Sequence, residues 1–120
     1  MRKLLPLFAL ACVATLPGCG GSGQTSAAAP EDKQSDKRGA AVACLTERQK
    51  LDARAEGVDR IQVDGATGPS VRFFLTSGEA EAEQFEGHAE GSEQISSALL
   101  YPRQGSDETV EKVEDCLAHL

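Results

Sequence analysis

Aromatic side chains are scarce in this chain of 120 residues, which has four Phe, one Tyr and no Trp. Its apolar content rests instead on Ala, Val and Leu. A chain of this length forms one small domain at most. Such a domain buries a modest core and is only marginally stable unless a covalent link reinforces it.

Positive charge is also scarce. Among residues 40–120, seven Lys and Arg stand against sixteen Asp and Glu, which gives a net charge of −9. Nucleic-acid binding depends on cationic contacts to phosphate, and attachment to anionic lipid by charge alone depends on a basic surface. We therefore expect no nucleic-acid partner and an acidic, solubilising surface.

The chain also lacks an apolar run of the roughly 20 residues that a membrane-spanning helix needs. Its longest run, residues 4–16, has 13 residues and follows the two cations Arg2 and Lys3. A charged start, a short apolar run and small residues near its end are typical of a secretory signal peptide.

Leu16-Pro17-Gly18-Cys19 ends this run and precedes a segment rich in Gly and Ser. It resembles the lipobox of bacterial lipoproteins, although Pro17 stands where Ala or Ser is commoner. The resemblance implies a diacylglyceryl group on the Cys19 thiol and cleavage between Gly18 and Cys19, and two acyl chains suffice for stable anchoring. The alternative is ordinary cleavage after Ala14, which would leave a soluble secreted protein.

These observations predict three segments. Residues 1–18 are a lipoprotein signal peptide, residues 19–39 are the lipidated cysteine and a flexible linker, and residues 40–120 are a small α+β domain. The linker is assigned because Gly20 to Gly39 has no apolar periodicity and is too polar to bury a core. We expect the domain to lie at the cell membrane on its extracytoplasmic face, anchored through Cys19.

Hydrophobic periodicity within the domain predicts the order α-β-β-α-β-α, with a three-stranded sheet and packed helices. The first two strands should pair antiparallel, and the following strand–helix–strand unit should cross over right-handed. Thr76 and Glu79 resemble a capping box at the start of the second helix. The expected helices are 41–56, 79–90 and 107–120, and the expected strands are 60–64, 71–76 and 93–101.

Four cysteines remain to be assigned. Cys12 leaves with the signal peptide and Cys19 takes the lipid, so Cys44 and Cys116 are left as an even pair in a small exported domain, a pattern that favours a disulfide. Two alternatives remain open: a zinc or copper site that also uses His119, and a redox-active pair.

No catalytic or cofactor motif stands out, so we expect neither an enzyme nor a bound cofactor or metal. There is no GxSxG, SxxK, HExxH, Walker or GxGxxG pattern and no EF-hand loop. His88 is expected to be a solvated surface histidine. The four acidic side chains Glu79, Glu83, Glu86 and Glu90 are expected to form a solvated helix face rather than a calcium site.

The whole pattern resembles small exported bacterial lipoproteins of unknown function. It favours a non-catalytic binding or modulatory module that meets a protein or small ligand at the membrane. The alternative is a small cell-envelope enzyme or accessory factor whose site is made of dispersed residues, and a ligand-binding lipoprotein is a third reading.

Overall fold

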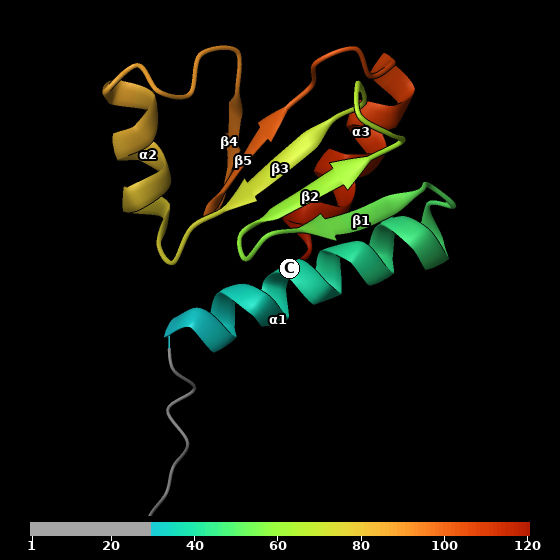
Figure 1. The fold of residues 1–120 in the computed structure, drawn as a ribbon, viewed down its shortest axis with the longest axis horizontal. Helices are drawn as coiled ribbons and strands as arrows, with labels where there is room; N and C mark the ends of the chain where they lie inside the picture. Colours follow the sequence, from blue (N-terminus) through green and yellow to red (C-terminus); the bar gives the residue numbers. More distant parts are fainter. Residues whose placement is uncertain (1–29) are drawn as a thin grey trace, which may run out of the picture.

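The computed structural model describes residues 30–120 (Figure 1). The predicted signal peptide, the lipobox and the first part of the predicted linker lie outside the described residues. Nine elements follow in the order α1 (Pro30–Ala43), η1 (Cys44–Arg48), β1 (Ala53–Glu56), β2 (Arg60–Val63), β3 (Ser70–Phe73), α2 (Ser77–Phe85), β4 (Glu93–Ile95), β5 (Ala98–Tyr101) and α3 (Asp107–Ala118). No helix among them is long and apolar enough to cross a bilayer.

The strands form one five-stranded sheet in the order β1-β2-β3-β5-β4, and every neighbouring pair is antiparallel. The α+β class is therefore confirmed, whereas the three-stranded sheet is wrong. The expected strand–helix–strand crossover is present between β3 and β4: both strands are antiparallel to β5, so they run parallel to each other, and α2 connects them. It differs from the expectation because β5 lies between its two strands.

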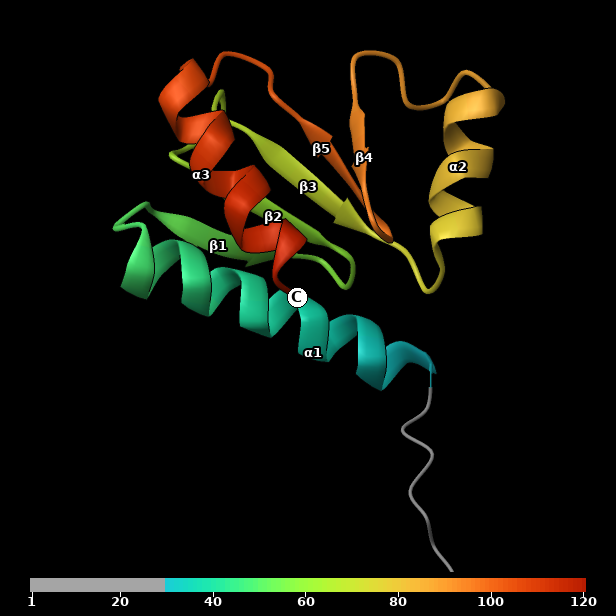
Figure 2. The ribbon, with the colours of Figure 1, turned by 180° about the vertical axis from the view of Figure 1, so that it is seen from behind.

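One face of the sheet packs against α3 and α1, as the view from behind shows (Figure 2). Side chains of alternate strand residues point to this face, because successive residues of a strand face opposite sides. The fully buried residues of this layer form the main core. They include Leu45, Ile61, Val63, Val71, Phe73, Leu100, Val113 and Leu117.

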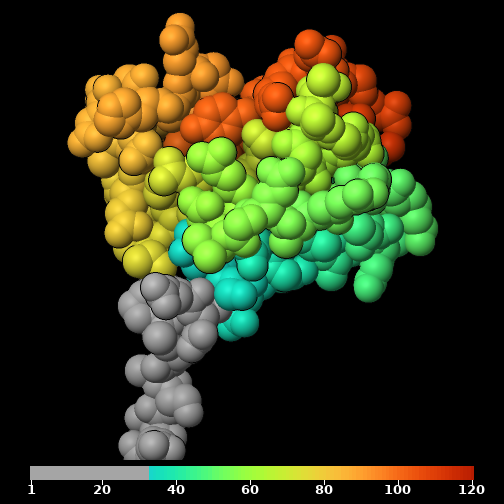
Figure 3. Space-filling model, in the orientation of Figure 1, coloured from blue at the N-terminus to red at the C-terminus, as the bar shows by residue number. Residues whose placement is uncertain are grey.

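The opposite face is covered only at one end. There a smaller cluster joins Phe74, Ala80, Ala89 and Leu99, with Tyr101 packed at its margin. The remaining surface over β2 and β3 is not covered by a helix, and it faces the viewer in Figure 3. Phe74 follows Phe73 of the main core and points to the opposite face, where it packs against Ala80 of α2.

The first predicted helix is wrong in its second half. The α-helix ends at Ala43, the wider turn η1 follows, and Ala53–Glu56 is a strand that pairs with Arg60–Val63. Lys50 has a left-handed φ of 58°, which stops the helix and redirects the chain. The residues ARAE, which suit a helix by propensity, are held as an edge strand by this pairing.

α1 begins at Pro30, inside the segment that was expected to be the linker. Its polar side chains do not bury a core but hydrogen-bond across the fold. Gln34 donates to the carbonyl of Phe73, and Lys37 Nζ lies 2.9 Å from Ser97 Oγ. Pro at the first position of a helix is favoured because its missing N–H would have no partner there.

The predicted cap of α2 is present in part. The Glu79 N–H donates to Thr76 Oγ1 at 3.2 Å, but the Glu79 carboxylate accepts from the N–H of Leu75. The helix ends at Phe85 rather than near residue 90, and Gly87 follows with a φ of 77°. The Phe85 side chain is exposed, and Ala80 is the buried residue of α2.

The expected strand 93–101 is a hairpin of two short strands. Ser96 has a left-handed φ of 56°, which turns the chain between Ile95 and Ala98 and makes the two halves pair with each other. The last predicted helix matches α3, whose first turn is capped by Ser106 Oγ accepting from the Thr109 N–H.

The predicted disulfide is present and joins Cys44, the first residue of η1, to Cys116 in α3, with a Cα–Cα distance of 5.8 Å. Both residues contact the main core, and Cys116 is buried. The bond therefore fixes the two helical segments on the same face of the sheet.

Candidate functional site

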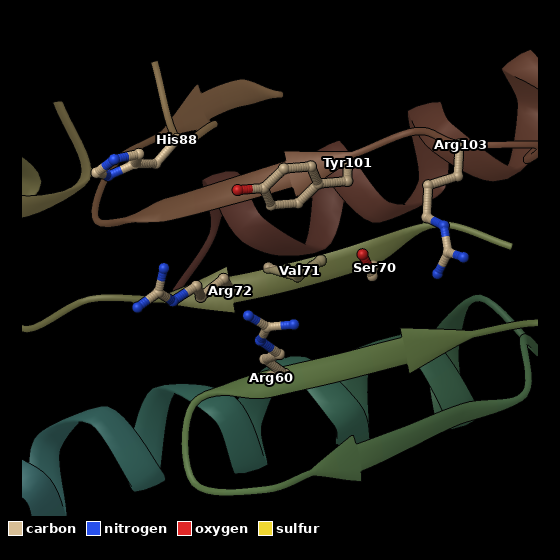
Figure 4. Close-up of a pocket in the computed structure, with 7 residues that line it drawn as sticks. All are labelled: Arg60, Ser70, Val71, Arg72, His88, Tyr101 and Arg103. Atoms are coloured by element: carbon tan, nitrogen blue, oxygen red, sulfur yellow. The ribbon is translucent and has the colours of Figure 1, made fainter. Parts of the chain in front are cut away.

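The uncovered face of the sheet holds a groove of about 400 Å³, which Figure 4 shows. It lies over β2, β3 and β5, between the loop after α2 and the loop after β5. Three of its seven lining residues are arginines, and the lining consists of Arg60, Ser70, Val71, Arg72, His88, Tyr101 and Arg103. We refer to this set as the arginine groove.

The concentration of cations is unusual for this chain. Ten Lys and Arg stand against nineteen Asp and Glu among residues 30–120, and three of the ten line this one groove. Arg60 and Arg72 lie directly opposite each other across the β2–β3 pair. Like charges in this position repel and destabilise a sheet, so the arrangement needs compensation from nearby anions.

Arg72 receives that compensation from the protein itself. Its Nε lies 3.0 Å from Asp59 Oδ2, and its Nη1 lies 3.3 Å from Glu83 Oε2 on α2. The guanidinium also stacks over the Phe74 ring, 4.7 Å from the ring centre, which is a favourable cation–π geometry. Arg72 therefore ties α2 to the sheet and forms a fixed wall of the groove.

Arg103 is positioned by a clamp between two loops. Gln62, nearly buried, donates through its amide nitrogen to the Gly68 carbonyl at 3.0 Å, and its Oε1 accepts from Arg103 Nη1 at 3.3 Å. The N–H of Gln104 donates to the Thr67 carbonyl at 3.1 Å. These bonds attach the loop after β5 to the loop between β2 and β3.

The backbone of this clamp is strained. Arg103 has a left-handed φ of 52°, a conformation that costs a non-glycine residue free energy. Two nearby glycines allow the close packing: a Cβ at Gly68 would lie 2.0 Å from the Val63 carbonyl oxygen, and one at Gly105 would lie 2.5 Å from the Pro69 ring. The clamp thus directs a cation into the groove.

Arg60 is only weakly compensated by carboxylates. Its only ion pair among the described residues is a distant one, 4.0 Å from Asp59 Oδ1, and its side chain is 59% exposed. Ser70 lies opposite Tyr101 in the β3–β5 register, and the Tyr101 hydroxyl points along the groove toward His88 (Figure 4). The groove therefore presents cations together with two hydroxyl groups.

His88 closes one end of the groove together with two carboxylates. Its Nδ1 lies 3.5 Å from Glu86 Oε2 and 3.9 Å from Glu83 Oε2, and the three ligand atoms lie within 4.8 Å of one another. Glu83 is already paired with Arg72, and the side chains of Glu86 and His88 are mostly exposed. His88 is thus at the surface, as expected, but it also contributes to the groove.

The predicted site residues lie elsewhere. Gly18 and Cys19 are outside the described residues, and the disulfide between Cys44 and Cys116 lies on the helical face of the sheet. In this bonded form neither cysteine offers a thiolate to a metal, and His119 Nδ1 is 2.6 Å from the Asp115 carbonyl. Residues 79–90 do not form one helical face, because α2 ends at Phe85.

Sequence reasoning missed the groove. A signal for part of it was present: in the alternating strands around Ile61 and Val71, Arg60 and Arg72 take the positions that face away from the core. The missing information was which strands are neighbours and that no helix covers that face. The position of Arg103 depends on a loop clamp that no sequence period encodes.

The comparisons with known proteins add no relative: no family model, no curated protein and no solved structure matches this chain.

Proposed function

We propose that this chain is a non-catalytic, lipid-anchored module that binds an anionic ligand in the arginine groove at the extracytoplasmic face of the cell membrane. One observation carries the ligand class: three of the ten Lys and Arg among residues 30–120, a strongly acidic segment, converge on a single groove. Guanidinium groups form strong, charge-assisted hydrogen bonds to carboxylates and phosphates.

The arrangement of the groove supports binding rather than catalysis. Nucleophilic catalysis needs a hydroxyl or thiol within hydrogen-bond reach of a base. Among the described residues, no hydrogen bond joins Ser70 or Tyr101 to His88, whose close partners are Glu83 and Glu86. The arginines, in contrast, are positioned by ion pairs and by the loop clamp, which favours a pre-formed binding site.

The anion site is tested by titrating the full chain, in detergent and at low chloride, with inorganic phosphate while amide signals are followed by NMR. We expect signals of Ser70, Arg72 and Tyr101 to shift, and Arg60→Gln to weaken binding about threefold or more, because it removes an exposed charge-assisted contact. Arg48→Gln is the matched control, since Arg48 is also exposed but lies on η1 at the helical face. Equal affinities for all three proteins, or no groove shift at all, would contradict the proposed site.

The lipid anchor rests on the Leu16-Pro17-Gly18-Cys19 motif and has its own test. Cells that express the chain are fed a labelled fatty acid, and we expect label in the wild type and none in Cys19→Ala. Cys12→Ala serves as the control, because Cys12 lies before the predicted cleavage site. Equal labelling of the wild type and Cys19→Ala would exclude lipidation at this cysteine.

A further inference from the structure

We propose that the ligand of the arginine groove is a small dianion, whose two anionic groups are separated by a ring-sized spacer and bound one by Arg60 and one by Arg103. This inference rests on the proposed function, because it specifies the ligand of the same groove. It is carried by the unequal compensation of the three guanidinium groups and by their positions along the sheet.

The protein neutralises one arginine and leaves two available. Arg72 has two carboxylate partners, Asp59 and Glu83, at 3.0 and 3.3 Å. Arg60 has only the distant contact to Asp59, and Arg103 has a neutral amide oxygen as its partner. A ligand with one anionic group would leave one of the two remaining cations without a counter-charge, whereas a dianion satisfies both.

The two available cations occupy separate positions. Arg103 is hydrogen-bonded to Gln62, which follows Arg60 by two residues on β2 and therefore lies about 7 Å further along the strand. Figure 4 shows the same separation, with Ser70 between the Arg60 and Arg103 side chains. One compact anion such as a single carboxylate does not span this distance, but two anionic groups on a spacer do.

The space between the two cations suits such a spacer. The groove volume of about 400 Å³ falls in the range of sites for small molecules. The partly buried Tyr101 ring lies along this stretch and offers an apolar surface with a hydroxyl at its end, and the Ser70 hydroxyl lies opposite it. A ring or a sugar would therefore contact both an apolar surface and hydroxyl groups.

The test uses matched series of anions and the full chain in detergent at low chloride. One series is the linear dicarboxylates from succinate to suberate, each compared with a monocarboxylate of similar length. A second pair is fructose 1,6-bisphosphate and fructose 6-phosphate. Affinities are measured by NMR titration or calorimetry for the wild type, Arg60→Gln, Arg103→Gln and the control Arg48→Gln.

We expect the best dianion to bind about tenfold more tightly than its monoanionic partner, because the second guanidinium adds a charge-assisted contact. Affinity should rise with the length of the dicarboxylate until both ends are reached. Arg60→Gln and Arg103→Gln should each lower the affinity for the dianion to the affinity for the monoanion. Arg48→Gln should keep the full preference for the dianion. Arg60→Lys and Arg103→Lys keep the positive charge and should retain part of the preference for the dianion. This result would show that the losses in the Gln variants are not caused by misfolding.

The outcomes separate this inference from the proposed function. If monoanions and dianions bind in the groove with equal affinity, the proposed anion site is retained but the assignment of a dianionic ligand is wrong. If the dianion preference survives both single substitutions, the assignment of its two ends to Arg60 and Arg103 is wrong. If no anion binds, both the proposed function and the inference fall.

Discussion

The sheet face that packs against α1 and α3 and the sheet face that holds the arginine groove use the same strands in different ways. On the helical face, residues such as Phe73 and Leu100 are fully buried, and the Cys44–Cys116 bond joins the two helical segments above them. On the groove face, arginines and hydroxyl groups stand over the strands and are held by ion pairs and hydrogen bonds. The comparison shows that the apolar packing and the covalent link that stabilise the fold lie on one face. The other face can therefore carry charged and hydroxyl side chains for binding.

The largest expected effect comes from breaking the helical face. Replacing both cysteines, as in Cys44→Ala with Cys116→Ala, opens a covalent loop of about 73 residues, and the chain-entropy model assigns such a loop roughly 4 kcal/mol. We expect the midpoint of urea unfolding to fall sharply, since the whole stability of a domain this size is of similar order. Reduction of the wild type with dithiothreitol should reproduce the loss. An unchanged midpoint would show that the helical packing alone stabilises this face.

A smaller effect is expected on the groove face, and it should differ between two arginines of the same strand pair. Arg72→Met removes the partner of Asp59 and Glu83, whose side chains are 25% and 27% exposed, and should cost about 1–2 kcal/mol. Arg60→Gln removes an exposed side chain and should change stability by less than about 0.5 kcal/mol. Thermal unfolding of the two variants measures the difference. Equal losses would contradict the distinction between a structural and a ligand-binding arginine.

The smallest effect concerns two acidic side chains of α3. Partial burial, together with the neighbouring carboxylates of Glu93 and Glu111, raises the pKa of Glu114 above its ordinary value of 4.5. A raised pKa in the folded state means that this group stabilises the fold at low pH and that the benefit is lost as the pH rises through the raised value. Glu114→Gln should therefore stabilise the domain at pH 7 by less than about 1 kcal/mol, and the gain should shrink below pH 4.5.

Glu108 provides the control of opposite sign. Its hydrogen bond to Lys112 lowers the pKa of Glu108, so its contribution is present at neutral pH and is lost as the pH falls through the lowered value. Glu108→Gln should slightly destabilise the domain at pH 7, as measured by thermal unfolding across a pH series. Identical pH dependence in both variants would contradict the assigned directions.

The sequence predicted the elements with strong periodicity. The alternation around Ile61 and the stripe of Val113 and Leu117 identified β2 and α3, and the pairing of Cys44 with Cys116 followed from their number and the expected export. The class of fold followed from these elements. In each case the local pattern and the tertiary environment agree.

The remaining features depend on contacts that no local pattern shows. Residues 53–56 become a strand because β2 pairs with them, and the left-handed turns at Lys50 and Ser96 divide segments that read as continuous. α1 extends back to Pro30 because its polar side chains find partners on distant segments. The arginine groove combines residues 60–103 through strand order and a loop clamp, so it becomes visible only in the folded chain.

The disulfide has a topological consequence for cleavage by proteases. Every strand of the sheet lies between Cys44 and Cys116, as do the exposed turns around Val58 and Gly65. A single cut in any of these turns produces two fragments that stay covalently joined, so both would separate only on a reducing gel. After one cut, the arginine groove would therefore stay covalently joined to α1. Its release requires either a second cut on the other side of the groove or reduction of the disulfide in the cut chain.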